Sequence, residues 1–415
     1  MKILSLLDNK TRKNLLLLFP CGLLFELSNA ALLPIIPAYL QEVCSTIQEV
    51  GLVMGFFAIG LILSRNFLGH MADKQGRKVV ILIGTISGVL VPLGYLSIKS
   101  LYGLIFIRIL GGISLAAFST AYDALVVDWS PHQYKGEIIS YMNLISPLSF
   151  CLGPLIGDLI SQAIGYDGMF AVSLVICLLA VIFALKVKDK NTYANHNHQP
   201  INNFIKNKAI RLLNKDSFLI PTIVMLLMGI NFGALITFLP LYIKELSINF
   251  NIGIFYSIAA IASFIIRFIS GNASDRYGRG IFITTSIVCY GVAMLILSQA
   301  NTSFELILAA IIEGAAIGII FPLVTALVSD RCGMQERGRV FALCLGGFDI
   351  GLAIARPVLS YVAAFYGYQT LYSLATLIAV YTFIIFITLS NKTIKNSLGF
   401  AFGLTKDYHQ IQQQE

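Results

Sequence analysis

The sequence GHMADKQGR, at Gly69–Arg77, returns 202 residues further along the chain as GNASDRYGR, at Gly271–Arg279. Both copies follow the pattern G-x-x-x-D-x-x-G-R and match without a gap. A match in one register between distant segments indicates that the chain consists of two copies of one structural unit. The repeated positions are Gly69 with Gly271, Asp73 with Asp275, Gly76 with Gly278, and Arg77 with Arg279.

The register continues where no motif requires it. At the same offset Arg65 matches Arg267, and one residue out of step Tyr39 matches Tyr242. The two copies therefore correspond over most of their length. Further matches are Gly112 with Gly314, Asp128 with Asp330, Gly136 with Gly338, Pro37 with Pro240, and Pro154 with Pro357.

The composition is that of an integral membrane protein. Apolar residues make up 57% of the chain and charged residues 12%, whereas a soluble domain carries about 25% charged residues. A helix needs about 20 apolar residues to cross a bilayer core of roughly 30 Å, and twelve runs reach that length. They fall near residues 14–39, 49–70, 79–97, 101–124, 138–162, 168–187, 218–242, 253–272, 281–299, 304–327, 339–363 and 369–390.

These runs decide the fold class. They are unbroken, whereas the strands of a membrane barrel alternate over about ten residues, so a barrel is excluded. The sequence predicts an all-α membrane protein with twelve transmembrane helices in two parallel six-helix pseudo-repeats. The expected parts are an N-terminal bundle at 1–187, a cytoplasmic linker at 188–217, a C-terminal bundle at 218–390 and a polar cytoplasmic tail at 391–415, much of it disordered.

The basic residues set the expected orientation. With both termini in the cytoplasm, 23 of the 29 Lys and Arg lie on that side and two, Lys99 and Lys244, lie outside, which satisfies the positive-inside rule. The net charge of +8 then reflects loops that face anionic lipid headgroups. No base-reading motif accompanies it, so nucleic acid is not an expected partner. We expect a multi-pass protein of the cell membrane that works as a monomer.

Other classes of site find little support in the sequence. The seven cysteines show neither a disulfide framework nor metal-ligand spacing. His196 and His198 lie in the polar linker without the cysteines or carboxylates that would complete a ligand set. No phosphate-binding loop is present to supply energy from ATP. We expect no catalytic residue, no metal and no cofactor.

Two parallel six-helix repeats, each with G-x-x-x-D-x-x-G-R between its second and third helices, resemble the major facilitator superfamily over nearly the whole chain. Parallel repeats are a known transporter architecture. Glycine at Gly69 would let its helix approach a helix of the other copy closely. Asp73 is expected just past a helix end, where its carboxylate can accept from free N–H groups near Arg339. Asp275 is expected to do the same near Glu137.

The rest of the motif is expected to act locally. Gly76 permits a tight turn, and Arg77 can reach Asp128 at the end of the fourth helix. The resemblance implies the same pairing in the second copy, through Gly278, Arg279 and Asp330. Together with Gly69, Asp73, Gly271 and Asp275, these residues are the candidate gate.

A second resemblance favours an exporter. Arg108-Ile-Leu-Gly111-Gly112 is similar to the R-x-x-x-G motif of the fourth helix, and Gly153-Pro154-Leu-Ile-Gly157 is similar to the G-P-x-x-G core of the antiporter motif. Proline removes a backbone hydrogen bond and the glycines permit close packing, so the fifth helix can bend or pack closely against the other half. Asp158 departs from the motif, which usually has a second glycine there.

Ionisable residues within membrane spans usually face a cavity or a partner. Glu26, near the middle of the first span, can carry a coupling proton, because loss of water contact favours the neutral form of a carboxyl. A hydrogen bond that only fastens the bundle is an equal alternative. Arg65, Arg267 and Asp123 are interpreted as structural. The remaining proton-coupling candidates or their charge partners are Arg108, Asp158, Glu313, Asp349 and Arg356.

The leading hypothesis is a secondary transporter that exports a small amphiphilic molecule in exchange for protons by alternating access. The main alternative is an importer or symporter of an organic anion or sugar, with Arg356 as the fixed positive charge. A membrane enzyme or receptor is a third alternative, but no acid pair or Ser-His-Asp set projects from the loops. The expected partners are a small-molecule substrate, protons and the lipid bilayer.

Overall fold

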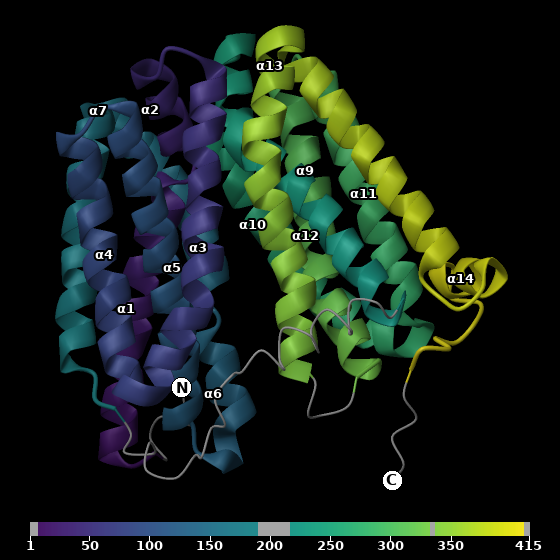
Figure 1. Cartoon of the computed structure of the whole chain (residues 1–415), viewed down its shortest axis with the longest axis horizontal. Coiled ribbons are helices and arrows are strands. Elements are labelled where there is room, and N and C mark those ends of the chain that lie inside the picture. The colour runs from purple at the N-terminus through teal and green to yellow at the C-terminus, as the bar shows by residue number, and fades with distance from the viewer. Residues whose placement is uncertain (1–6, 190–215, 333–336, 411–415) are drawn as a thin grey trace. The chain divides into compact units, whose positions relative to one another are not determined.

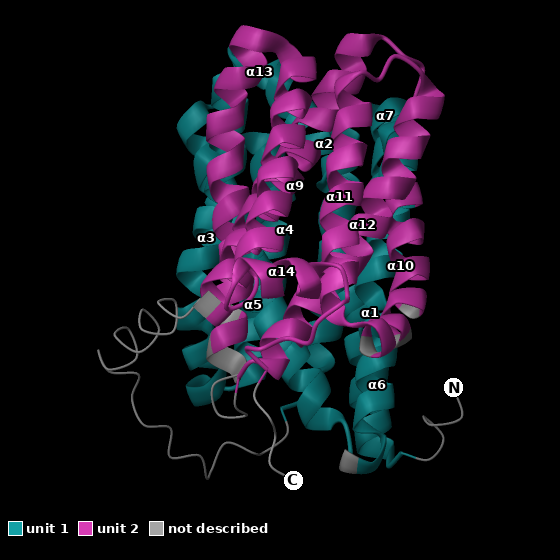
Figure 2. Ribbon diagram, turned by 90° about the vertical axis from the view of Figure 1, so that its right-hand side faces the viewer, with its two compact units in different colours: residues 1–198, 251–257 teal, residues 199–250, 258–415 magenta. Residues whose placement is uncertain are grey.

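The structure is a computed structural model that describes residues 7–189, 216–332 and 337–410. Throughout these residues the regular secondary structure is helical, without a strand. The chain forms two compact units, coloured separately in Figure 2: residues 1–198 with 251–257, and residues 199–250 with 258–415. The predicted all-α class is confirmed.

The order of helices repeats between the units (Figure 1). The first unit contains α1 (Asn9–Leu32), α2 (Ile35–Val43), α3 (Ile47–Gln75), α4 (Arg77–Ser97), α5 (Leu101–Trp129), the short 3-10 helix η2 (His132–Tyr134), α6 (Lys135–Met142) and α7 (Ile145–Lys186). Then follow α9 (Asp216–Leu246), α10 (Ile252–Tyr277), α11 (Arg279–Ser298), α12 (Ser303–Asp330), α13 (Arg337–Leu389) and α14 (Ile394–Ala401).

In the described part of the chain, ten helices are long and apolar enough to cross a membrane. Two of these hold two predicted spans each. The 42 residues of α7 would make about 63 Å of straight helix, twice the thickness of a bilayer core. The helix is interrupted at Gly165, with φ 75°, as α13 is at Gly367, with φ 80°. The two glycines stand at the repeat offset, and counting each arm once gives the twelve predicted spans.

Two helices that are not equivalent in the repeat, α3 and α12, begin with the same side-chain cap. The Thr46 side chain accepts from the backbone N–H of Glu49, and the Glu49 carboxylate accepts from the N–H of Thr46. Thr302 and Glu305 make the same reciprocal pair at the start of α12. Such capping boxes satisfy backbone donors that the first helical turn leaves open.

Glycine lets helices approach closely at equivalent places in the two units. A side chain at Gly112 of α5 would overlap the backbone of α3 at Phe57 and Leu61. A side chain at Gly314 of α12 would overlap the backbone of α10 at Ala259. The register match of these two glycines therefore has a packing cause.

Large apolar side chains stand on the outside of the helices. Leu63 is 74% exposed, Phe67 69% and Phe106 63%. Such exposure would be costly in water, but it suits helices that are covered by lipid. The structure thus agrees with a multi-pass membrane protein.

The expectation of a mostly disordered tail is wrong for residues 391–410. The Thr393 side chain accepts from the backbone N–H of Asn396 and starts α14. The Phe400 ring of α14 lies 6.2 Å from the Phe386 ring of α13, centroid to centroid. The tail therefore packs on the second unit, with residues 411–415 outside the described residues.

Arg331 fastens this tail. Its guanidinium is buried and pairs with Asp407, with Nε 2.7 Å from Oδ2 and Nη2 3.1 Å from Oδ1. It also donates to the backbone carbonyls of Ser390 at 2.9 Å and Ser217 at 3.0 Å. One cation thus joins the tail to the ends of α12 and α13 and the beginning of α9. The sequence analysis missed Arg331, although it directly follows Asp330.

Candidate gating and transport residues

The two arginine–aspartate pairings predicted from the repeat are confirmed. Arg77, the first residue of α4, forms an ion pair with Asp128 near the end of α5 and also donates to the carbonyl of Ala124. Arg279, the first residue of α11, has Nη2 3.0 Å from Oδ2 of Asp330 at the end of α12. Each pair ties the beginning of one span to the end of the next.

The glycine before each arginine has a backbone conformation that other residues rarely adopt. Gly76 has φ 105° and Gly278 has φ 91°. A residue with a Cβ atom would be strained there. The glycine lets the chain turn directly from one span into the next, and this turn places the arginine opposite its aspartate.

The expected position of Asp73 is wrong by a few residues. The helix α3 extends to Gln75, so Asp73 lies in its last turn rather than past its end, and its side chain is exposed. A carboxylate near the C-terminus of a helix meets an unfavourable dipole. Asp275 likewise lies inside α10, and its side chain is outside the described part of the structure.

The glycine at the start of the motif has no packing role within its own unit. A Cβ atom at Gly69 or at Gly271 would meet no heavy atom within 4 Å. This differs from Gly112 and Gly314, which are packed against neighbouring helices of the same unit. Close approach to the other copy at Gly69 remains a prediction.

Gly153 and Gly157 pack against α1 of the same unit. The expected packing of this stretch against the other half stays a prediction. A Cβ atom at Gly153 would lie 2.7 Å from Cβ of Ala30, and one at Gly157 would lie 2.9 Å from the carbonyl carbon of Ala31. Pro154 lies within α7 between them. The motif therefore brings α1 and α7 together along a glycine face.

Asp158 is buried and well supplied with hydrogen bonds. The Gln162 side chain donates from Nε2 to Oδ2 at 3.0 Å. The backbone N–H of Gly253, in the first turn of α10, donates to the same carboxylate. The first backbone N–H groups of a helix have no partner within the helix and attract a negatively charged acceptor. Asp158 therefore caps the start of α10.

Glu26 is not isolated in the structure. It lies on α1 near Asp123 of α5, and the two carboxyl groups interact electrostatically. Arg65 of α3 interacts in turn with Asp123. Three helices thus bring two acids and one base near one another in the first unit. The sequence analysis interpreted Asp123 and Arg65 as structural, because Arg65 precedes the repeated motif by a turn and Asp123 lies near the end of its predicted span.

Arg108 is held inside the first unit. Its side chain is only 7% exposed, its guanidinium lies 4.7 Å from the centroid of the Phe57 ring, and it interacts with the hydroxyl of Tyr95. A guanidinium over an aromatic face gains a cation–π attraction, which favours the buried cation. This position suits a fixed charge in the wall of the bundle.

The second unit places an acid where the first has glycine. Glu313 of α12 is 3% exposed and interacts with Tyr290 of α11. At the repeat offset these residues correspond to Gly111 and Gly88. The units are therefore alike in backbone but not in charge. Two further candidates, Asp349 and the buried Arg356, lie two turns apart on α13.

No group of three or more His, Cys, Asp or Glu residues that could hold a metal ion occurs among the described residues. His196 and His198 lie outside them, as does most of the predicted linker.

Comparison with known proteins bears on the whole chain. The family model described as Major Facilitator Superfamily matches residues 18–279 and 249–405. The staphylopine export protein of Staphylococcus aureus strain Mu50 is 24% identical over 381 residues, which cover 88% of this chain and 92% of that protein. The multidrug resistance protein MdtG of Salmonella arizonae is 23% identical over 357 residues, which cover 82% of this chain and 86% of that protein.

Solved structures share the fold. A crystal structure of the nucleoside transporter NupG superposes with a TM-score of 0.77 at 16% identity, covering 93% of this chain and all of that one. The human organic anion transporter MFSD10 superposes with a TM-score of 0.66 at 16% identity, covering 91% of this chain and all of that one. These two similarities concern the fold alone.

Proposed function

The chain belongs to the Major Facilitator Superfamily, a family of membrane transporters, and from this premise we propose that it exports a small amphiphilic molecule in exchange for protons. Export is supported by the two curated relatives, which are named as an export protein and a multidrug resistance protein. The antiporter-like stretch Gly153–Gly157 agrees with that direction. The chain is a transporter rather than an enzyme.

The observation that carries proton coupling is the interaction of two carboxyl groups within the first unit. Glu26 and Asp123 lie near each other on different helices. Acidic residues inside membrane spans are expensive to bury and commonly form the proton relays of pumps and transporters. In the proposed cycle the pair takes a proton when it opens to one side and releases it when it opens to the other.

The repeated motif supplies the gate. Asp73 and Arg77 hold the cytoplasmic side closed in the outward-facing state, and Asp128 keeps Arg77 in place. The exposed carboxylate of Asp73 in the last helical turn supports this, since it is unfavourable where it stands and gains from a partner elsewhere. Asp275, Arg279 and Asp330 do the same in the second copy.

The proposed setting is the cell membrane, with both termini and residues 188–217 in the cytoplasm and the protein working as a monomer. The distribution of Lys and Arg supports this orientation. The two bundles are residues 1–187 and 218–390, and the linker and tail lie on the same side.

A second candidate is the import of an organic anion with protons. The buried guanidinium of Arg356, 3% exposed on α13, favours it. A fixed cation within a span attracts an anionic substrate. The direction of substrate movement relative to an imposed pH gradient separates the two candidates.

The deciding experiment is flux in proteoliposomes. Purified protein is reconstituted, a pH gradient is imposed in either direction, and a panel of drugs, siderophores and organic anions is followed. Antiport predicts that substrate moves against the flow of protons. Movement of substrate together with protons would establish the symporter, and absence of any flux across the panel would contradict the amphiphile class.

A further inference from the structure

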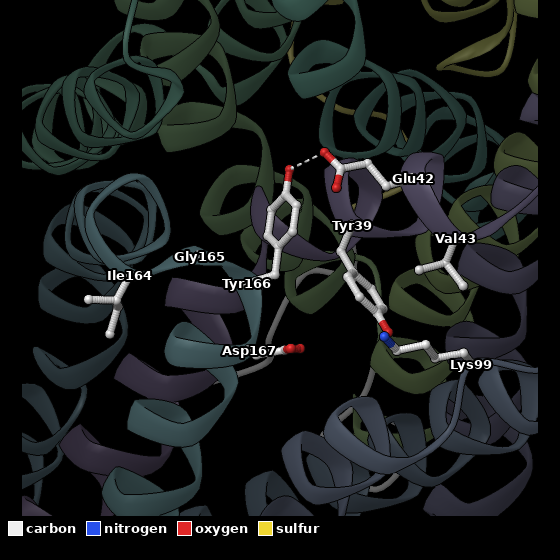
Figure 3. Close-up of a pocket in the computed structure, with 8 residues that line it drawn as sticks. All are labelled: Tyr39, Glu42, Val43, Lys99, Ile164, Gly165, Tyr166 and Asp167. Atoms are coloured by element: carbon white, nitrogen blue, oxygen red, sulfur yellow. Dashed lines mark hydrogen bonds between the residues drawn. The ribbon is translucent and has the colours of Figure 1, made fainter.

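A pocket lies in the first unit, at the end of the bundle opposite the Arg77–Asp128 pair. It has a volume of about 580 Å³, within the range of about 300–1,000 Å³ that is usual for small-molecule sites. It is formed where the end of α2, the turn between α4 and α5, and the kink of α7 come together (Figure 3). Its lining residues are Tyr39, Glu42, Val43, Lys99, Ile164, Gly165, Tyr166 and Asp167.

The backbone of α7 shapes this pocket. The break at Gly165 turns the chain and places Tyr166 and Asp167 at the start of the second arm. Tyr166 donates from its hydroxyl to Oε1 of Glu42 at 3.3 Å, which fixes its ring. The ring of Tyr39 stands at 69° to that of Tyr166, with the centroids 5.8 Å apart. Two aromatic rings held at an angle make a corner for an apolar body.

Opposite charges face each other across the pocket. Figure 3 shows the Asp167 carboxylate and the Lys99 ammonium pointing inward from two sides. In the part of the chain that the structure describes, neither forms an ion pair within 4 Å, with the other or with a third residue. Both side chains are exposed. A molecule that carries both charges would satisfy the two groups together.

We propose that this pocket binds a small zwitterion, whose ammonium group meets Asp167, whose carboxylate meets Lys99, and whose apolar body lies against Tyr39 and Tyr166. The proposal goes beyond the transport function, because it needs neither a direction of flux nor a coupling ion. With the orientation proposed above, the pocket faces the outside of the cell.

The test uses the full-length protein in nanodiscs and three probes that differ only in charge. L-Phenylalanine carries both groups, phenethylamine lacks the carboxylate, and 3-phenylpropionate lacks the ammonium. Binding is measured by competition with tritiated L-phenylalanine in a scintillation proximity assay. We expect L-phenylalanine to bind about three- to tenfold more tightly than either partial ligand, as charge-assisted contacts at a partly exposed site provide.

Variants assign each charge to its residue. In Lys99→Gln the ligand carboxylate should no longer matter, so L-phenylalanine and phenethylamine should bind alike. In Asp167→Asn the ammonium should no longer matter, so L-phenylalanine and 3-phenylpropionate should bind alike. Lys186→Gln, which removes an exposed charge at the other end of α7, is the matched control and should bind as the wild type does.

Three results would overturn the proposal: no saturable binding of L-phenylalanine, equal affinity for all three probes in the wild type, or unchanged affinity in both pocket variants. The last result would place the ligand at a different site. Because the assay measures binding without a gradient, its failure leaves the flux experiment to be judged separately.

Discussion

At the scale of single residues, Glu26 is the group with the clearest proposed task. Glu26→Gln mimics the permanently protonated acid, so uphill transport driven by a pH gradient should be lost. Substrate binding should stay measurable, because the amide keeps the size and polarity of the side chain. The measurement is flux in proteoliposomes beside equilibrium binding of the same substrate.

Asp123→Asn is the companion variant. If the pair shares one proton, this change should alter the pH dependence of transport without abolishing it. Wild-type accumulation of substrate by Glu26→Gln would place the coupling site elsewhere, and Glu313 or Asp349 would be tested next.

Arg331 and Asp407 allow a test of stability. The two side chains are 0% and 8% exposed. Removal of one partner leaves the other charge buried without compensation, which lowers the free energy of unfolding by about 3 kcal/mol or more. Asp407→Asn should therefore lower the melting temperature of the purified protein clearly, as measured by thermal unfolding in detergent.

The matched control is Asp330→Asn. The side chains of Arg279 and Asp330 are 20% and 29% exposed, respectively. Water can therefore solvate the remaining arginine, and the free energy of unfolding should fall by about 1 kcal/mol or less. Equal losses of stability in Asp407→Asn and Asp330→Asn would contradict the view that burial makes the Arg331–Asp407 pair the more important of the two for stability.

At the scale of helices, three glycines separate backbone strain from packing. Gly165→Ala places a Cβ atom at φ 75° and ψ 177° with no atom within 4 Å, so only backbone strain of about 1–3 kcal/mol is expected. Gly157→Ala drives a Cβ atom into the backbone of α1 at Ala31 and should cost about 1–3 kcal/mol or more. Gly136→Ala, in open space on α6, should be neutral or stabilising by about 1 kcal/mol.

Thermal unfolding measures the melting temperature of the three variants. We expect it to be highest for Gly136→Ala, lower for Gly165→Ala and lowest for Gly157→Ala. Transport should also fall most in Gly157→Ala, because α1 carries Glu26. A Gly157→Ala protein as stable as the wild type would mean that α1 and α7 shift apart without cost.

The proposed closure of the cytoplasmic side by Asp73 and Arg77, here called the latch, depends on contacts at helix ends. Asp73→Asn should shift the population toward the inward-facing state by about 1–2 kcal/mol, the strength of partly buried helix-end contacts. Transport should fall without a loss of fold. Accessibility of single cysteines on each side, compared between variant and wild type, measures the shift.

Lys74→Gln is the control for this variant, since Lys74 is adjacent and exposed and is not a defining position of the G-x-x-x-D-x-x-G-R pattern. Unchanged accessibility and unchanged flux in Asp73→Asn would contradict the latch.

The helices show which features of the structure can be predicted from the sequence and which cannot. Periodic signals that lie within one segment, such as the apolar runs and the G-x-x-x-D-x-x-G-R repeat, predicted the spans and the Arg77–Asp128 pair. The neighbourhood of Glu26 and Asp123 depends on how α1 packs against α5, and no local pattern encodes it. The folded tail was missed for the same reason. Its polar composition does not reveal that Asp407 pairs with the buried Arg331 at the end of α12.

At the scale of the whole molecule, the orientation can be tested with labels. A single cysteine placed at Asn191, in a background without the seven native cysteines, should not react with an impermeant maleimide added outside intact cells. It should react once the cells are opened. Ser100→Cys, in the predicted outer turn, should react in both conditions, and the reverse pattern would mean that the orientation is inverted.

Replacing the native cysteines matters for one of them in particular. Burial and the nearby Glu49 raise the pKa of Cys44 to about 11, so at neutral pH its thiol is almost entirely protonated and reacts slowly. In a protein that keeps Cys44, a rise in pH increases its thiolate fraction, and labelling at alkaline pH would include it on the same side as Ser100. Removal of Cys44 therefore allows the reporter cysteines to be read at any pH.

The contact between Arg331 and Asp407 bears on how the protein can be handled at the bench. Trimming a polar C-terminus, often done to aid crystallisation, would here cut away the counter-ion of a buried cation if the new end preceded residue 407. A purification tag or fluorescent fusion joined after residue 410 would keep the ion pair intact, and a library of shortened chains should show expression collapsing at that boundary.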